Sequence, residues 1–254
     1  MKSQESDDSA ARVARAAVMT EAGSDLQLQE FPRPAAPLRG LLVRVACCTI
    51  CRSDLHTWKG RRPGPTPAIL GHEIVGVVAE LGEGVSQDSA GQPLAVGNRV
   101  TWTLHSCCGG CRACVDWRLP MKCELLRKYG HDACDHPPHL RGGFAEHCVV
   151  DRGTGVIKLP DSLADHVAAP ANCAAATAVA GLDAAGFKSG QSLLILGAGA
   201  VGCYAAAFAK MTGARQVIAA DRLAAAQRFG ADGVIDSSDT ATVADEVRAA
   251  TGVD

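Results

Sequence analysis

Ser192–Gly202 reads SLLILGAGAVG, and it sets the architecture of the C-terminal part of the chain. A short apolar run typical of a strand, Ser192–Leu196, leads directly into the pattern Gly-x-Gly-x-x-Gly, and a helix is expected to open at Gly199. In such a loop Gly197 permits a tight turn, Gly199 lets the backbone approach a pyrophosphate, and Gly202 lets helix and strand pack closely. The helix N-terminus supplies N–H groups and a positive dipole for phosphates. The stretch therefore predicts a dinucleotide-binding site.

An acidic residue strengthens this interpretation over the alternative of a plain glycine turn between strand and helix. Asp221 stands 19 residues after Gly202, directly after a second strand-like run, Gln216–Ala220. Its carboxylate is expected to accept a hydrogen bond from a ribose 2′-hydroxyl, which favours NAD over NADP. Arg222 beside it leaves some room for NADP.

Strands and helices alternate over the C-terminal third. Beyond the two strands above, we expect a helical stretch over Leu163–Ala184, helices over Leu223–Phe229 and Thr240–Ala250, and a strand over Gly233–Ile235. This alternation predicts βαβ units on a parallel sheet, here over residues 166–254. A full dinucleotide domain has two such halves, so we expect the chain to be the N-terminal part, or a truncated product, of a longer enzyme.

The preceding part of the chain reads as an irregular β domain over residues 13–165, after a polar tail at 1–12. Short β-type runs are separated by turn residues, and a Pro-Gly-rich loop at 60–67 cannot enter a central strand. The predicted strands are Arg12–Val18, Leu41–Ala46, Ile74–Leu81, Asn98–Thr103 and Ala145–Val150.

Composition excludes several classes of protein. The 254 residues are 47% hydrophobic and 20% charged, enough to bury a sizeable core. Twenty-five basic and 27 acidic side chains leave a net charge of −2, which gives no electrostatic footprint for nucleic acid or an anionic membrane. Residues 1–17 lack the apolar segment of a secretory signal, and no run is apolar enough to span a membrane. We therefore expect a cytoplasmic protein whose twelve cysteines are thiols rather than disulfides.

Four cysteines gather within 16 residues, in a lobe expected at about 105–125. Cys108, Cys111, Cys114 and Cys123 provide the four soft ligands of a closed, tetrahedral structural zinc site. A redox Cys-x-x-Cys would not need the other two cysteines. Cys107 can replace Cys108 in this set.

A second constellation is dispersed along the chain. Cys51, His72 and Cys173 form the three-ligand set of a catalytic zinc that keeps a fourth position open for water or substrate. Taken alone, His72 is more typical of a packed core histidine, and Cys173 of a small buried side chain.

In combination, these motifs resemble the zinc-dependent medium-chain alcohol dehydrogenases. The resemblance runs from Ala14 onward: Cys51-x-x-Asp-x-His56, Gly71-His-Glu73, the four-cysteine lobe, Cys173 and the glycine loop appear in the right order. Quinone reductases of the same architecture lack the zinc ligands. The resemblance implies a GroES-like β catalytic domain followed by a partial Rossmann domain, a doubly wound parallel sheet. It also implies hydride transfer between a small alcohol, or an aldehyde or ketone, and NAD.

The resemblance implies roles for the metal-site residues. Cys51, His72 and Cys173 would bind the catalytic zinc, with Glu73 beside it as an exchangeable ligand. Asp54 would orient the ligand imidazole, a contact that fixes its tautomer.

Three further roles follow from the resemblance. Ser53 and His56 would relay the proton of the alcohol to solvent, and Thr177 would contact the nicotinamide. A homo-oligomer is possible, but the sheet edge that dimerises in this family belongs to the absent half.

A narrower resemblance concerns Lys128–Asp135 and Pro170–Cys173, which look like a subgroup proposed to act in phosphonate catabolism. For His131, Cys134, His136 and His139 we expect a solvated loop rather than a third metal site.

Two departures from the family pattern and one competing function remain. Cys114 and Cys123 enclose eight residues where seven are usual, so either a loop residue bulges outward or Cys123 is misassigned. Asp221–Gly230 is about one helical turn short. The competing function is a zinc-stabilised, non-catalytic binding module or pseudoenzyme derived from the same family; a zinc-ribbon nucleic-acid binder is disfavoured by the net charge.

Overall fold

The computed structural model describes residues 13–221, 225–238 and 242–252. The chain divides into two compact units, Met1–Asn172 and Cys173–Asp254, and each is described by itself. This division lies seven residues after the boundary expected from the sequence. The expected polar tail and Arg222 fall outside the described residues.

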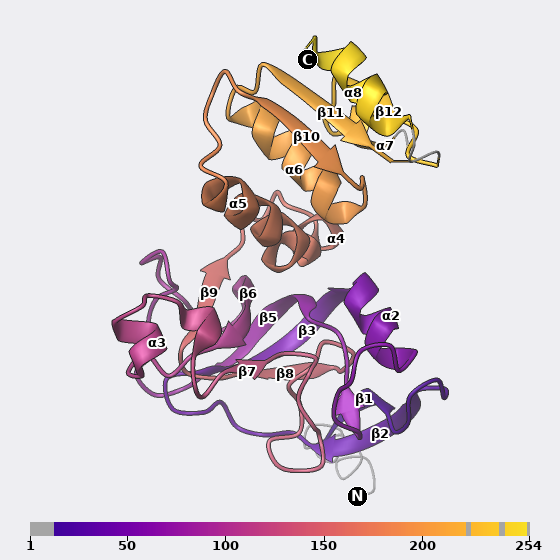
Figure 1. Ribbon diagram of the computed structural model, residues 1–254. Coiled ribbons are helices and arrows are strands. Elements are labelled where there is room, and N and C mark those ends of the chain that lie inside the picture. Colours follow the sequence, from indigo (N-terminus) through magenta and orange to yellow (C-terminus); the bar gives the residue numbers. More distant parts are fainter. Residues whose placement is uncertain (1–12, 222–224, 239–241, 253–254) are drawn as a thin grey trace, which may run out of the picture. The chain divides into compact units, whose positions relative to one another are not determined.

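The first unit is built on two antiparallel sheets (Figure 1). Its larger sheet has the strand order β7-β6-β5-β3-β8, with β9 also paired to β6, and its smaller sheet has the order β2-β1-β4. The strands of the larger sheet are β3 (Leu41–Thr49), β5 (Glu73–Leu81), β6 (Arg99–Ser106), β7 (Arg127–Lys128), β8 (His147–Val150) and β9 (Thr154–Lys158). Those of the smaller sheet are β1 (Val13–Met19), β2 (Gln27–Pro32) and β4 (Ala68–Ile69). Each of the five β runs predicted here coincides with a strand.

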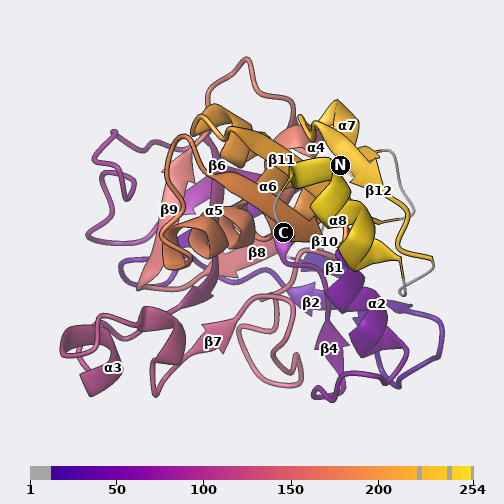
Figure 2. The same cartoon turned by 45° about the horizontal axis from the view of Figure 1, so that its top comes forward.

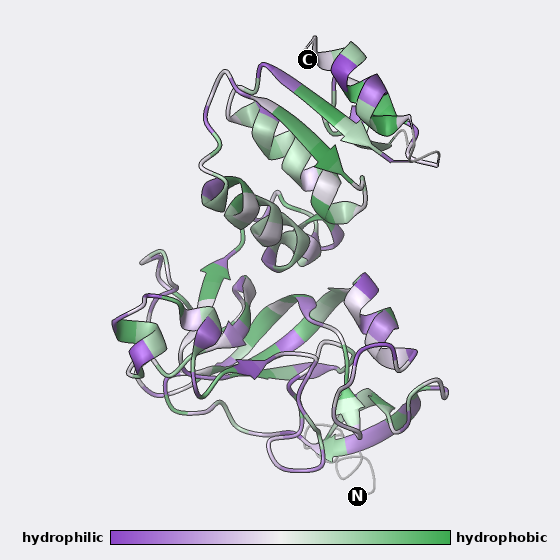
Figure 3. Cartoon of the chain, viewed as in Figure 1, coloured by the Kyte–Doolittle hydropathy of each residue, from purple (hydrophilic) through white to green (hydrophobic). Residues whose placement is uncertain are grey.

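The core of the first unit lies on the larger sheet. Apolar side chains of β3, β5 and β6 fill it, and much of β3 and β5 is green in Figure 3. Trp102 is 1% exposed and meets the Tyr129 ring edge-on, with 6.1 Å between ring centroids. Pairing of β3 with β5 sets Thr49 opposite Glu73 at one end of the sheet. The chain therefore leaves β3 beside the point where it enters β5.

Short helices connect these strands. Helix α2 (Arg52–Trp58) follows β3 and begins after Cys51, whose backbone N–H donates to the Asp54 carboxylate. Helix α3 (Arg112–Val115) and the 3₁₀ turn η1 (Pro120–Lys122) form a lobe between β6 and β7, which projects from the larger sheet (Figure 2). Helix α4 (Asp165–Ala168) and the 3₁₀ turn η2 (Ala169–Asn172) end the unit.

The prediction of continuous helical structure over Leu163–Ala184 is wrong. The structure divides it into α4, η2 and α5 (Ala174–Ala184). Pro170 has no N–H to donate to the carbonyl four residues earlier, so one helix cannot run through it. Cys173 has φ −117° and ψ −84°, outside the helical region, and precedes the first turn of α5.

The second unit is a three-stranded parallel sheet with helices on both faces. The strand order is β10-β11-β12, formed by Ser192–Leu196, Gln216–Ala220 and Gly233–Ile235, as predicted. Its other helices are α6 (Ala200–Met211), α7 (Ala225–Arg228) and α8 (Val243–Thr251). Helices α5 and α6 lie side by side in Figures 1 and 2.

Alternation along β11 explains the two covered faces. Val217 and Ala219 pack in the cluster that includes Ala206 of α6, whereas Ile218 and Ala220 pack in the cluster that includes Val243 of α8. Successive strand residues point to opposite faces. This is the doubly wound arrangement expected for residues 166–254.

The described residues contain neither a candidate membrane-spanning helix nor a disulfide bond. None of the described helices has both the length and the apolar character needed to cross a membrane. All twelve cysteines lie in the described ranges, and none is disulfide-bonded.

Asp88 fastens a loop of the first unit to β9. The side chain is 5% exposed; Oδ1 accepts from the N–H groups of Ala90 and Gln92, and Oδ2 accepts from the N–H of Lys158. These backbone donors, that of Lys158 foremost, hold the pKa of Asp88 below its usual value. We expect Asp88→Ala to lower the free energy of unfolding by about 2–3 kcal/mol at pH 7, measured by urea denaturation.

The pH dependence of this contribution has a defined sign. The pKa of Asp88 is lower in the folded than in the unfolded protein, so its stabilisation is present above about pH 4 and is lost as the pH falls further. The difference between wild type and Asp88→Ala should shrink accordingly below pH 4. The exposed Asp161→Ala is the control, and an equal loss in both variants would contradict the assignment.

Candidate active site and metal centres

Four potential metal ligands meet at the end of β3 and the start of β5. One ligand atom from each of Cys51, His72, Glu73 and Cys173 lies within 4.8 Å of all the others. Cys51 precedes α2, and His72 and Glu73 open β5, so the register of β3 with β5 makes these three neighbours.

Cys173 joins the set from about 100 residues away. It directly follows Asn172, the last residue of the first unit. The Asn172 Nδ2 group donates to the carbonyl oxygens of His72 and Trp102, at 2.8 Å each. The residue that precedes Cys173 is thus hydrogen-bonded to the backbone of the ligand His72.

The His72 imidazole is buried and oriented by a carboxylate. His72 and Asp54 are each 1% exposed, and His72 Nδ1 lies 3.1 Å from Asp54 Oδ1, which also accepts from Gly71 N–H. Burial lowers the pKa of His72, but hydrogen bonds to Asp54 and Cys51 outweigh it and raise the pKa to about 9. With Nδ1 held by Asp54, the Nε2 atom is directed to the ligand set.

The donors in this set fit a zinc ion. Thiolate, imidazole and carboxylate groups are all zinc ligands, and three protein ligands plus an open position are typical of catalytic zinc. Glu73 Oε2 accepts from the Thr49 hydroxyl at 2.6 Å, a contact that holds the carboxylate at the edge of the set.

Ser53 and His56 lie on α2 beside the set. Ser53 Oγ is 3.3 Å from His72 Nε2. His56 follows three residues later, so the two side chains share one face of the helix. Both are half-buried.

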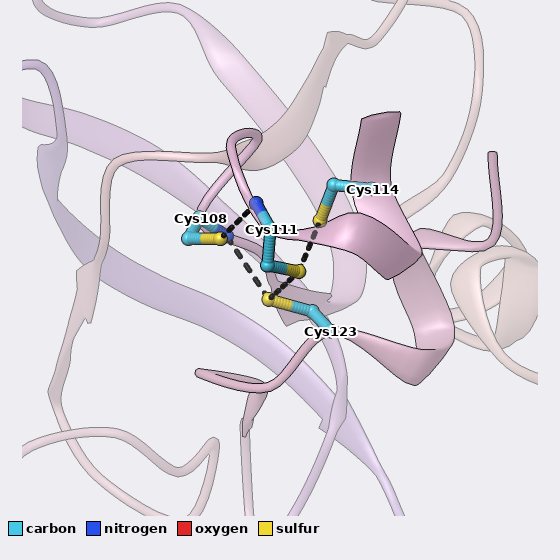
Figure 4. Close-up of side chains that lie close together, drawn as sticks. All are labelled: Cys108, Cys111, Cys114 and Cys123. Atoms are coloured by element: carbon cyan, nitrogen blue, oxygen red, sulfur yellow. Dashed lines mark hydrogen bonds between the residues drawn. The ribbon is translucent and has the colours of Figure 1, made fainter. Parts of the chain in front are cut away.

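The four cysteines of the lobe form the second group (Figure 4). Cys111 Sγ lies 3.5 Å from Cys114 Sγ and 3.9 Å from Cys123 Sγ. Backbone N–H groups point at the sulfurs: Cys111 N–H donates to Cys108 Sγ, and Cys108 N–H to Cys123 Sγ, both at 3.3 Å. Backbone donors act on the Cys111 sulfur too: the N–H of Glu124 foremost, and then that of Cys114, lower the pKa of Cys111 to about 6. This geometry suits a closed four-sulfur zinc site.

The structure places Cys108, and not Cys107, with Cys111 and Cys114, and Cys123 completes the group. Cys107 Sγ instead lies 3.5 Å from the carbonyl oxygen of Gly153. The eight residues between Cys114 and Cys123 include the exposed segment 115–119, in which Arg118 has a positive φ of 53°.

The glycine loop of the second unit has the expected geometry. Gly197 has φ +100°, which favours glycine, and its N–H donates to Ala220 O. A Cβ at Gly199 would meet nothing within 4 Å, whereas one at Gly202 would lie 2.0 Å from Gly197 O. Space is thus left above Gly199, at the first turn of α6, where a pyrophosphate would sit.

Asp221 lies against this loop, and Thr177 lies on α5. Asp221 Oδ2 accepts a short hydrogen bond from Ala198 N–H, so the carboxylate is fixed at the end of β11 beside the glycines. Thr177 occupies the first turn of α5 and is exposed.

Comparisons with known proteins agree with this geometry. Residues 39–161 match the alcohol dehydrogenase GroES-like domain. An alcohol dehydrogenase of Rhizobium meliloti is 34% identical over 244 residues, which cover 93% of this chain and 67% of the relative. The chain belongs to the zinc-dependent medium-chain alcohol dehydrogenase family.

Other members support the assignment. An alcohol dehydrogenase of Geobacillus stearothermophilus is 35% identical over 87% of this chain and 63% of its own length. The crystal structure of a Thermotoga maritima alcohol dehydrogenase superposes with a TM-score of 0.86 at 32% identity, covering 94% of this chain and 66% of that one. The chain thus spans about 63% of the length of the first curated relatives it matches.

Nicotinamide cofactors are present in two similar structures. A zinc-binding dehydrogenase of Sinorhizobium meliloti is bound to NADP; it is 30% identical, with a TM-score of 0.76, over 91% of this chain and 64% of that one. An E. coli dehydrogenase is complexed with NADH. It is 29% identical, with a TM-score of 0.77, and the match covers 95% of this chain and 67% of that one.

The solvated loop expected for His131, Cys134, His136 and His139 is wrong at three positions. His139 is half-buried, its ring lies 5.2 Å, centroid to centroid, from the Phe31 ring, and its Nδ1 atom is 2.7 Å from Cys134 O. The His131 ring is half-buried and lies 5.1 Å, centroid to centroid, from the His72 ring, and Cys134 is 3% exposed. Cys134 N–H donates to Pro67 O, which draws the loop inward, whereas His136 is exposed as expected. Neither of the two potential metal groups in the described residues includes them.

Sequence reasoning gave no role to three residues that contact the catalytic set: Thr49, His131 and Asn172. Thr49 and Asn172 lie two residues and one residue before ligand cysteines, so closeness in sequence was an available signal. His131 is 59 residues from His72, and no spacing rule connects them.

The four-cysteine lobe offers a matched pair of variants. Cys123→Ser should lose the metal of the four-sulfur group and lower stability by about 3 kcal/mol, a fall in melting temperature of roughly 6–12 °C. Cys107→Ser should change neither. Calorimetry measures the melting temperature of each variant, and metal analysis measures its zinc content. If Cys107→Ser lost the metal and Cys123→Ser kept it, Cys107 rather than Cys123 would be the ligand.

Proposed function

We propose that this protein acts in a zinc-dependent, NAD-linked alcohol dehydrogenase, which transfers a hydride between a small alcohol, or an aldehyde or ketone, and the cofactor. The observation that carries the proposal is the grouping of Cys51, His72, Glu73 and Cys173. A closed structural site requires no exchangeable carboxylate beside it, whereas a catalytic one benefits from it. The four-sulfur lobe would hold a second, structural zinc.

The residues around the set suit alcohol oxidation. A zinc ion bound there would act as a Lewis acid on the substrate oxygen. Asp54 keeps the His72 ring in one orientation. Ser53 Oγ, close to His72 Nε2, is placed to accept the proton of a substrate hydroxyl, and His56, one turn further along α2, to pass it to solvent.

The second unit would bind the cofactor. The space above Gly199 and the N–H groups of α6 suit the pyrophosphate, and Asp221 suits the adenosine ribose, which favours NAD over NADP. Thr177 would contact the nicotinamide. Cysteines without disulfides support a reducing, cytoplasmic location, and a homo-oligomer is part of the proposal.

A second candidate is a zinc-stabilised binding module that binds metal and dinucleotide without turnover.

One experiment separates the candidates. Zinc-loaded protein is incubated with NAD and a panel of primary, secondary and phosphonate-bearing alcohols, and NADH formation is followed by absorbance. Robust NADH formation that Ser53→Ala reduces supports the dehydrogenase. Zinc uptake and NADH binding without turnover support the binding module, and the absence of both contradicts the two together.

A further inference from the structure

We propose that Asn172 is a positioning residue for the catalytic metal site: its carboxamide ties the backbone just before Cys173 to the backbone of His72. The inference rests on the proposed function in one respect, namely that Cys51, His72 and Cys173 bind a metal ion. Asn172 itself contacts neither metal nor substrate in this proposal and acts through the two ligands it joins.

One side chain joins three segments of the first unit. Asn172 Nδ2 donates one hydrogen bond to His72 O, at the entry to β5, and one to Trp102 O, within β6. Trp102 is 1% exposed and His72 is 1% exposed, so both acceptors belong to the rigid interior of the unit. The end of η2 is thereby fastened to two neighbouring strands of the larger sheet.

The segment around Cys173 needs such a tie. Helix α4 ends at Ala168, η2 is a single 3₁₀ turn, and α5 starts only at Ala174. Cys173 has non-helical dihedral angles between them. A metal ligand must be held to within about 0.5 Å, and a junction between two helical segments does not provide that precision by itself.

The chemistry of the carboxamide fits this role. Both acceptors are carbonyl oxygens, so the group facing them must carry two N–H donors, which asparagine has and aspartate lacks. The Asn172 Oδ1 atom is buried without a hydrogen-bond partner among the described residues. A buried oxygen without a partner is costly, so the two donated bonds are what asparagine contributes at this position.

The test uses the isosteric variant Asn172→Asp, with the cobalt ion as the probe. Cobalt replaces zinc in the full chain, and its visible bands report ligand geometry. Added imidazole can enter an open catalytic site but not a closed four-sulfur site, so the imidazole-sensitive part of the spectrum belongs to the Cys51, His72 and Cys173 group. The carboxylate of Asn172→Asp would face two carbonyl oxygens and displace Cys173.

We expect Asn172→Asp to weaken cobalt binding at the imidazole-sensitive site by about 10- to 100-fold and to shift its bands. The imidazole-insensitive bands of the lobe should stay unchanged, which shows that the protein is folded. Asn98 is the only other asparagine of the chain and accepts from Ala95 N–H through Oδ1, a bond that aspartate keeps, so Asn98→Asp should match wild type.

Two results would overturn the inference in distinguishable ways. Wild-type affinity and bands in Asn172→Asp would remove the positioning role and leave the proposed function intact. If the wild-type protein showed no imidazole-sensitive cobalt site, the proposed function would be contradicted, and the inference would fail with it. If Asn172→Asp does not fold, Asn172→Ala, which removes the donors without adding charge, should show the same selective loss, and wild-type behaviour there would overturn the inference.

Discussion

Replacing Cys51 by serine is expected to leave one zinc ion per chain instead of two and to lower alcohol turnover by about 1,000-fold or more. Loss of the Cys51 thiolate leaves His72, Cys173 and the exchangeable Glu73, so the set of two thiolates and one imidazole is no longer complete. A metal ion that stabilises the reacting oxygen contributes several kcal/mol to the transition state, and about 4 kcal/mol corresponds to 1,000-fold. Metal analysis and the rate of NADH formation measure the two effects.

The matched control for this variant is Cys47→Ser. Cys47 lies four residues earlier on β3, is half-buried like Cys51, and belongs to neither metal group. It should retain two zinc ions and near-wild-type turnover. A Cys51→Ser protein that keeps two zinc ions would show that the dispersed set is not a metal site.

Replacing Gly202 by alanine is expected to lower NADH affinity by about 100-fold or more and to destabilise the second unit by about 2–3 kcal/mol. A Cβ at this position would lie 2.0 Å from Gly197 O and 3.2 Å from the Ile195 side chain. Gly197 adopts φ +100°, so the turn cannot move aside without losing the conformation that forms the loop. Fluorescence titration with NADH and thermal unfolding measure the two effects.

Variants at two other glycines distinguish an effect on packing from an effect on cofactor binding. Gly199→Ala adds a methyl group into open space at φ −70°, so stability should be unchanged, but NADH affinity should fall because the pyrophosphate needs that space. Gly181→Ala, inside α5 with open space around it, should leave NADH affinity unchanged and raise stability by about 0.5–1 kcal/mol, because alanine favours the helix. Wild-type NADH affinity in Gly202→Ala and Gly199→Ala together would contradict a dinucleotide site at this loop.

Local sequence signals succeeded where the physical cause is local. Strands β10, β11 and β12 have the predicted bounds because apolar runs there end at glycine or acidic turn residues. The metal-ligand candidates were identifiable because Cys and His at these spacings have few other uses in combination.

Failures occurred where the cause is distant in sequence. Pro170 was an available local signal for the break between α4 and α5, but the tie from Asn172 to His72 and Trp102, about 70 to 100 residues earlier, was not. His131 is buried against His72 because a loop folds inward, which no periodicity reveals. Strand β2 was missed because Gln27–Pro32 is a largely exposed edge strand without a clear apolar side.

The most direct test of this account is the number and behaviour of zinc ions in the purified chain. The account predicts two zinc ions per chain, one that exchanges readily through its open position and one held by the four-sulfur lobe. Cys51→Ser should remove the first and Cys123→Ser the second. A chain that binds no zinc, or zinc that survives both substitutions together, would contradict it.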